Sequence, residues 1–135
     1  MKYTPLPLAL FLLAGCAVQQ PPKPIKVEPE PIFYRYPMPE NAAHLAQSFV
    51  SHDIKDPDSA KFRDTFFASR DARGEARDKT KDSWCVEMNG KNSYGAYVGY
   101  AWALVPAGGT SVFMGANPLG NLATQICGSA KYPPT

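Results

Sequence analysis

Cysteine is the residue type in this chain with the widest covalent chemistry, and the sequence contains three, Cys16, Cys85 and Cys127. Cys16 ends a short apolar run, whereas Cys85 and Cys127 lie 42 residues apart in the second half of the chain. Neither of these two belongs to a Cys-x-x-Cys frame, which disfavours a redox-active pair. Two interpretations remain open for the pair, a structural disulfide or two buried free thiols.

The residues around Cys16 give the first cysteine a separate role. Residues 6–14 form a short apolar stretch behind the positive end that Met1 and Lys2 provide, as in an export signal. The run Leu13-Ala14-Gly15-Cys16 resembles the lipobox of bacterial lipoproteins. The resemblance implies a signal peptide over residues 1–15, transfer of a diacylglyceryl group to the Cys16 thiol, and cleavage that makes Cys16 the first residue. The alternative is a chance cysteine beside an ordinary secretory signal.

The lipidated cysteine, rather than the leader, is expected to hold the protein on a membrane. A transmembrane helix needs about 20 apolar residues, and the run here is far shorter and is interrupted at its start by Pro5 and Pro7. Two or three fatty chains, by contrast, hold a protein on a bilayer almost permanently. By the sorting rule of enteric lipoproteins, Ala17 after the cysteine implies the outer membrane, with the domain at its periplasmic face.

Residues 16–38 are expected to form the lipidated cysteine and a proline-rich tether. Six prolines lie among Gln, Lys and Glu in this range, namely Pro21, Pro22, Pro24, Pro29, Pro31 and Pro37. A polyproline-like chain of this kind rises about 3.1 Å per residue and acts as a semi-rigid spacer. Residues 32–36 are too aromatic for a pure linker. They either dock on the domain as an edge strand, which we favour, or bind a partner.

An oxidising periplasm favours a disulfide between Cys85 and Cys127. Closing a loop of 42 residues would stabilise the fold by about 4 kcal/mol on the chain-entropy estimate. That is a large share of the stability of a small domain.

Hydrophobic periodicity predicts the elements that must position these residues. Residues 40–52 have the spacing of an amphipathic helix, with Ala42, Leu45, Ala46 and Phe49 on its apolar face. Residues 61–68, 84–88, 96–105 and 111–114 are typical of strands, and the third is apolar enough to be covered on both faces. Residues 117–127 indicate a second helix, which begins at Asn117-Pro118.

The expected fold is therefore α+β, a small single domain over residues 39–132 with two helices on a three- to four-stranded antiparallel sheet and one disulfide. Residues 69–83 intermix five basic and four acidic side chains and indicate a solvated, mobile loop.

The most distinctive polar segment lies between the second and third predicted strands and contains Lys91, Asn92, Ser93 and Tyr94. The simpler interpretation, which we favour, is turn chemistry, because Asn and Gly tolerate positive φ and Asn and Ser bond to nearby backbone. The alternative is a small binding surface for a glycan, a peptide or a protein. A related hypothesis is an aromatic platform of Tyr94, Tyr100 and Trp102, which share a parity along the chain.

Catalytic and metal chemistry find little support in the sequence. The two histidines, His44 and His52, are eight residues apart on one predicted helix, so they differ by about 80° and two turns and cannot share a metal ion. Glu87 is the sole candidate acid beside the polar segment. We therefore expect no catalytic residue, metal or cofactor. The chain has 14 Lys and Arg against 12 Asp and Glu, so its charge gives no argument for nucleic acid.

Residues 56–63 and 85–100, which read DPDSAKFR and CVEMNGKNSYGAYVGY, resemble a pattern in small bacterial envelope proteins of uncharacterised activity. The chain has Val86 and Ala96 where that pattern often has glycine. The resemblance implies a compact α+β module and carries over no catalytic residue.

The sequence thus predicts a non-enzymatic structural or interaction module of the cell envelope, whose partner is another envelope protein or peptidoglycan. Two alternatives stay open. One is a peptidoglycan-active hydrolase, which would need Glu87 or another acid in a cleft. The other is a periplasmic inhibitor of lysozyme, for which Lys91 and Ser93 would be the inserting residues.

Overall fold

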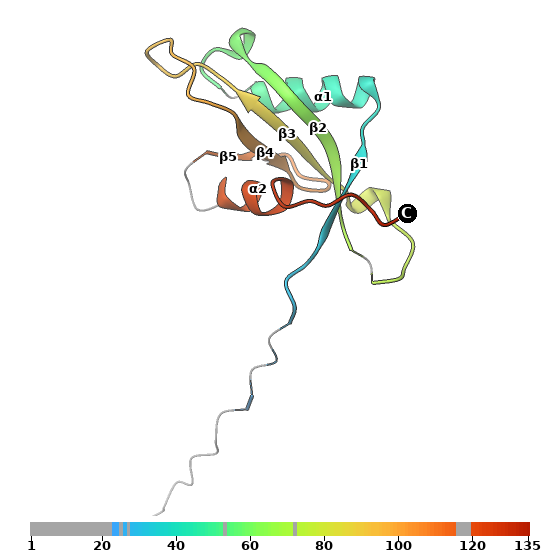
Figure 1. Ribbon diagram of the computed structural model, residues 1–135. Coiled ribbons are helices and arrows are strands. Elements are labelled where there is room, and N and C mark those ends of the chain that lie inside the picture. The colour runs from blue at the N-terminus through green and yellow to red at the C-terminus, as the bar shows by residue number, and fades with distance from the viewer. Residues whose placement is uncertain (1–22, 25, 27, 53, 72, 116–119) are drawn as a thin grey trace, which may run out of the picture.

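A five-stranded antiparallel sheet forms the centre of the computed structural model, with its strands in the order β1-β2-β3-β4-β5 (Figure 1). The structure describes residues 23–24, 26, 28–52, 54–71, 73–115 and 120–135. The strands are β1 (Phe33–Pro37), β2 (Lys61–Arg70), β3 (Ser83–Asn89), β4 (Ala101–Val105) and β5 (Phe113–Met114). The helices are α1 (Glu40–Ser51) and α2 (Gly120–Cys127), and short 3₁₀ turns cover Pro57–Ser59 and Lys79–Lys81.

The α+β class with two helices is confirmed, and the expectation of three to four strands is wrong because residues 33–37 add a fifth. Every residue of β1 pairs with β2, from Phe33 opposite Arg70 to Pro37 opposite Phe66. The aromatic segment before residue 38 thus docks as the edge strand, as we favoured, and the sheet begins at Phe33 inside the range assigned to the tether.

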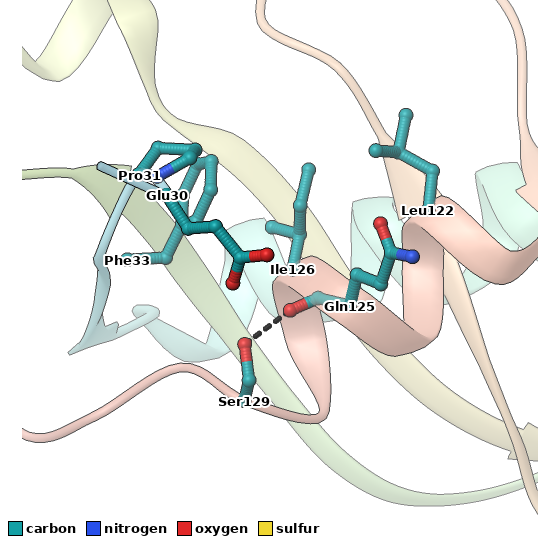
Figure 2. A pocket seen from close by; sticks show the side chains of 7 residues that line it. All are labelled: Glu30, Pro31, Phe33, Leu122, Gln125, Ile126 and Ser129. Carbon is teal, nitrogen blue, oxygen red and sulfur yellow. Dashed lines mark hydrogen bonds between the residues drawn. The ribbon is translucent and has the colours of Figure 1, made fainter. Parts of the chain in front are cut away.

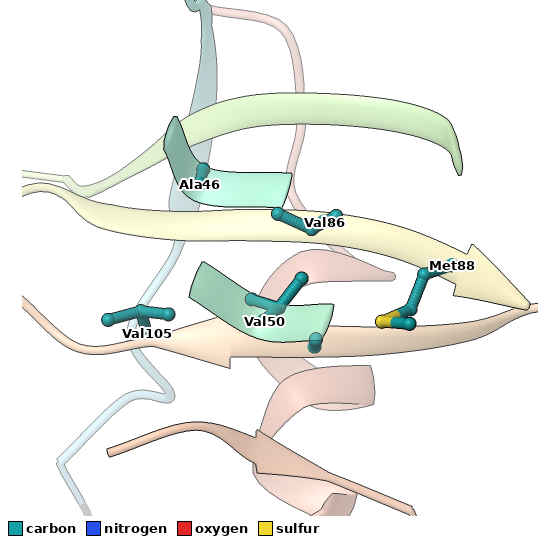
Figure 3. Packing of buried hydrophobic residues seen from close by; sticks show 6 residues of the cluster. Ala46, Val50, Val86, Met88 and Val105 are labelled. Carbon is teal, nitrogen blue, oxygen red and sulfur yellow. The ribbon is translucent and has the colours of Figure 1, made fainter. Parts of the chain in front are cut away.

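The two helices cover opposite faces of the sheet. Neighbouring residues of a strand point to opposite faces, and two neighbours in β3 pack against different helices. Val86 packs in one core cluster with Ala46 and Val50 of α1 (Figure 3). Its neighbour Cys85 packs in a second cluster with Ala123 and Cys127 of α2. The sheet is therefore the middle layer of three.

Strand β4 confirms the expectation of a strand covered on both faces, but it begins at residue 101 instead of residue 96. Ala103 and Val105 belong to the cluster under α1, and Leu104 belongs to the cluster under α2. Residues 96–100 keep only an isolated bridge between Tyr97 and Lys91, because Gly99 has φ 102°, a left-handed conformation that interrupts a strand. Strand β5 is likewise shorter than predicted, over two residues instead of four.

Helix α1 matches its prediction within one residue, but one residue of its expected apolar face is exposed. Ala46 and Val50 are fully buried, and Phe49 packs edge-on against Trp84 with ring centroids 6.1 Å apart. Leu45 projects into solvent. The start of the second helix at Asn117-Pro118 lies outside the described residues, and its end at Cys127 agrees with the sequence.

Most described residues of the charged segment between β2 and β3 are exposed, as expected of a solvated loop, but one ion pair fastens the segment to the sheet. Arg77 donates hydrogen bonds to both carboxylate oxygens of Asp82, whose side chain is 3% exposed. The guanidinium of Arg77 also stacks 3.6 Å from the centroid of the Tyr36 ring on β1. Mixed charge indicated solvation, but it reflects a buried ion pair in this part of the segment.

The C-terminal segment covers the outer edge of β1. The N–H of Lys131 donates to the carbonyl of Phe33 (2.9 Å), and the N–H of Arg35 donates to the carbonyl of Lys131 (2.8 Å). The Arg35 guanidinium stacks on the rings of Phe66 (4.1 Å) and Tyr132 (5.0 Å) and forms an ion pair with Asp64. The C-terminal segment is thereby fixed to the edge strand β1.

Among the described residues, none of the helices has the length and apolar character needed to cross a membrane.

Candidate functional site

The loop over residues 90–100, here called the β3–β4 loop, projects from one end of the sheet (Figure 1). It contains the four polar residues that the sequence singled out. It also contains most of the large apolar side chains that the described part of the fold leaves exposed.

Asn92 builds the turn at the tip of the loop. Its side-chain oxygen Oδ1 accepts hydrogen bonds from the N–H groups of Tyr94 (2.9 Å) and Ala96 (3.1 Å). Its backbone N–H donates to the carbonyl of Ala96 (2.8 Å), and its carbonyl accepts from Gly95 (3.0 Å), which has φ 79°. For Asn92 the turn interpretation is therefore the correct one.

The base of the loop is tied to the 3₁₀ turn Pro57–Ser59. The backbone N–H of Lys91 donates to the Ser59 hydroxyl (3.4 Å), and the Tyr97 hydroxyl donates to the Ser59 carbonyl (3.0 Å). The side-chain oxygen of Asn89 accepts from the N–H of Gly99 (3.0 Å), so it replaces a ladder bond where the strand is interrupted. These contacts fix the orientation of the loop relative to the sheet.

Positively charged groups lie over the aromatic rings of the loop. The Lys61 ammonium lies 4.2 Å from the centroid of the Tyr97 ring, and the Lys91 ammonium lies 5.6 Å from the same centroid. The Arg63 guanidinium lies 4.5 Å from the centroid of the Tyr100 ring. Cation–π contacts of this kind hold long side chains in place at a surface.

Lys61 and Arg63 are functional candidates that the sequence analysis did not single out. Both lie at the start of β2, where Lys61 pairs with Asn89 at the base of the loop. Strands joined in antiparallel order bring the start of one to the end of the next, so the order of the predicted strands could have placed them there.

The other predicted residues of the loop divide by exposure. The Tyr94 residue is 94% exposed, Ser93 is exposed, and the apolar Val98 is 70% exposed. Lys91 is half-buried along the Tyr97 ring. The structure thus assigns Asn92 to the turn and leaves Lys91, Ser93 and Tyr94 at the surface.

The aromatic platform of Tyr94, Tyr100 and Trp102 does not form. Trp102 packs edge-on against Phe66 beside helix α2, with ring centroids 5.5 Å apart. The Tyr100 ring lies against Arg63. Of the three rings, Tyr94 is the one that stands clear of the fold.

Glu87, the candidate acid, is held by Arg63 at the same end of the sheet. The guanidinium donates to both carboxylate oxygens, with Nε 2.7 Å from Oε2. The hydrogen bond to Glu87 is the main cause that raises the pKa of the Arg63 guanidinium above its usual value. Both oxygens of this acid are therefore engaged.

The histidines do not meet. His44 lies 3.7 Å from Glu40 on the exposed side of α1, and His52 follows the last turn of that helix. Across the described part of the chain, no three His, Cys, Asp or Glu side chains gather as metal ligands would.

Two hollows border these elements. One, of about 210 Å³, lies beneath the β3–β4 loop and is lined by Ile54, Met88, Val98 and Met114 together with glycines. The larger, of about 440 Å³, lies between α2 and the segment that enters β1 (Figure 2). Leu122 and Ile126 line it from the helix, and the Ser129 hydroxyl donates to the Gln125 carbonyl at its rim. Neither brings together an acid, a base and a nucleophile.

Cys85 and Cys127 form the predicted disulfide, with Cα atoms 5.5 Å apart and both residues buried. It joins β3 to the last residue of α2 and is enclosed by apolar neighbours. Its burial among apolar residues indicates a structural role for the disulfide. Cys16 lies outside the described residues.

The chain matches no family model. No curated protein and no solved structure is similar to it either.

Proposed function

We propose that the protein is a lipid-anchored, non-enzymatic interaction module of the bacterial outer membrane that presents the β3–β4 loop to a partner. Cys16 carries the fatty chains, residues 17–32 act as the tether, and the domain from Phe33 onward holds the binding surface.

The observation that supports this proposal is that the loop and the start of β1, where the proposed tether would enter, lie at opposite ends of the sheet. Strand β1 begins at Phe33, opposite Arg70 at one end of β2, and the β3–β4 loop begins beside Lys61 at the other end (Figure 1). The ten residues of β2 separate these ends by about 30 Å. A domain held through its N-terminal segment would therefore direct the loop away from the membrane.

The tether determines how far the loop can reach. Residues 17–32 would span about 50 Å as a polyproline-like chain at 3.1 Å per residue. With the length of the sheet added, the loop samples the periplasmic space well beyond the lipid headgroups. Such a position suits contact with a partner that is not the anchoring bilayer.

The hydrolase alternative finds less support in the surroundings of its acid. Both oxygens of Glu87 accept hydrogen bonds from Arg63, and a general acid or base needs one of them available to substrate. The side chain is also mostly covered, at 13% exposed. A binding role requires no such group.

Metabolic labelling and crosslinking in cells test the two parts of the proposal separately. We expect labelled palmitate to enter the wild-type chain and not Cys16→Ser, which should lose its association with outer-membrane vesicles. A photocrosslinking residue at position 94 should capture an envelope component, and the same residue at Leu45, exposed on α1, should not. An unlabelled wild-type chain would overturn the anchor, and equal capture at both positions would overturn the role of the loop.

A further inference from the structure

We infer that the β3–β4 loop binds peptidoglycan, and that the Lys61 and Lys91 ammoniums bind its carboxylates while Tyr94 stacks on its sugar rings. This inference rests on the proposed function and adds the chemistry of the partner.

The first step concerns the two ammonium groups. Their distances to the Tyr97 centroid are 4.2 and 5.6 Å, so they cannot be more than about 10 Å apart. Neither lies within 4.0 Å of a carboxylate in the described part of the chain, although Asp56 and Asp58 belong to the neighbouring turn. Two like charges held close together favour an anionic ligand that contacts both.

Four other cations of the domain are paired with acids, unlike Lys61 and Lys91. Three arginines, Arg35, Arg63 and Arg77, each form an ion pair with a carboxylate. Lys81 likewise pairs with Asp78 at 3.4 Å. Arg70, Arg73 and Lys131 are also without an ion pair in the described part of the chain, but Lys61 and Lys91 are the two cations that lie over one ring of the loop. Their charge is therefore available there together.

The second step concerns Tyr94 and its surroundings. Its ring is exposed and no cation of the described residues lies over it, whereas Lys61 and Arg63 lie over the rings of Tyr97 and Tyr100. An exposed aromatic ring stacks well on the apolar face of a sugar. The loop therefore presents one exposed aromatic ring in addition to the two ammoniums that lie over Tyr97.

The third step selects the ligand. The loop would face away from the membrane to which the tether attaches the domain. The anionic lipid headgroups of that bilayer are therefore not its expected ligand. Peptidoglycan offers both required chemistries in one polymer, because its stem peptides carry carboxylates and its strands are chains of sugar rings. A partner with carboxylates alone would contact only the two ammoniums, and a neutral sugar polymer would contact only the Tyr94 ring.

Cosedimentation of the full-length protein in detergent with purified sacculi tests the inference. We expect wild type to sediment with sacculi and the retained fraction to fall as salt rises from about 0.05 to about 0.3 M, because screening weakens exposed charge contacts. Lys61→Gln with Lys91→Gln should weaken retention about tenfold, and Tyr94→Ser should weaken it severalfold. The matched control, Lys79→Gln with Lys81→Gln, makes the same charge change at the other end of the sheet and should bind as wild type.

Modified ligands identify the chemistry. Sacculi whose carboxyl groups have been converted to amides should lose the protein, and vesicles rich in phosphatidylglycerol should not retain Cys16→Ser. Failure of wild type to bind native sacculi would overturn the inference, as would full retention by amidated sacculi or by Lys61→Gln with Lys91→Gln. A preference for the vesicles over sacculi would assign the loop to a lipid surface instead. Palmitate labelling would be unaffected by any of these results, so the anchor and the ligand are tested independently.

Discussion

Arg77 and Asp82 form a two-point ion pair that fastens the loop between β2 and β3 to the edge of the sheet. The carboxylate is nearly fully covered, and the guanidinium lies on the Tyr36 ring. A buried acid is stable in that position only while its partner remains, because an unpaired charge away from water is costly.

Arg77→Ala should therefore destabilise the domain by about 3 to 5 kcal/mol, the usual cost of leaving a buried charge unpaired. Urea unfolding followed by tryptophan fluorescence would measure it. Lys81→Ala removes the exposed pair with Asp78 and should cost no more than about 1 kcal/mol. Equal effects of the two substitutions would contradict the burial of the Arg77–Asp82 pair.

Reduction of the disulfide should lower the free energy of unfolding by about 4 kcal/mol, since the bond closes a loop of 42 residues. Cys85→Ser with Cys127→Ser should show a similar loss in urea unfolding. Non-reducing gels should show faster migration of the wild type than of this variant. An unchanged midpoint under reducing conditions would mean that apolar packing alone holds α2 to the sheet.

Asn92→Ala should loosen the β3–β4 loop, because the amide N–H groups of Tyr94 and Ala96 both lose their acceptor. We expect about 1 to 2 kcal/mol less protection of these amides in hydrogen exchange, with the sheet unaffected. Ser93→Ala is the matched control, because its side chain is exposed and the turn does not depend on it. A Ser93→Ala exchange pattern like that of Asn92→Ala would argue against the turn described here.

The fold could be read from the sequence where the periodicity is local. Alternation along β3 correctly places Val86 and Cys85 on opposite faces, and the expected disulfide between Cys85 and Cys127 is confirmed. The fifth strand was undercounted because residues 33–37 lie in proline-rich surroundings, and their strand depends on pairing with β2 far along the chain. Leu45 fits the helical pattern, yet it is exposed because it lies about 100° around the helix from the buried Ala46.

The candidate site was predictable only in part for the same reason. The polar run Lys91 to Tyr94 is visible in the sequence, and so is its capacity for a turn. Its combination with Lys61 arises from the antiparallel register between β2 and β3, which brings together residues that are distant in the chain. Such a surface has no motif that a single sequence could display.

The pKa of Asp78 is lowered chiefly because the Thr80 hydroxyl donates to its carboxylate (2.6 Å), with a further bond from the Thr80 N–H (3.0 Å). A lowered pKa in the folded state means that this contact stabilises the turn above the pKa of the unfolded chain. The stabilisation is lost as the pH falls through the folded pKa. An NMR titration should show the Asp78 midpoint rising in Thr80→Ala, and an unchanged midpoint would contradict the assigned cause.

Neither catalytic nor inhibitory activity is expected of the purified protein. Zymography on peptidoglycan should show no clearing, because the oxygens of Glu87 are engaged by Arg63. Added protein should leave the rate of cell lysis by lysozyme unchanged, because the loop is proposed to bind the cell wall and not the enzyme. Clearing that disappears in Glu87→Gln would establish the hydrolase, and a dose-dependent loss of lysis would establish the inhibitor.

The attachment of the N-terminal segment to β1 determines how the domain would respond to force. Tension between a membrane and a partner held at the far end of the sheet would act along the axis of β1. The five paired residues of this strand, the Arg35 contacts and the Lys131 bonds would then be strained together in shear instead of opening one by one. An edge strand that is bonded on both sides, to β2 and to the C-terminal segment, would thus resist a pulling force applied through the N-terminal segment.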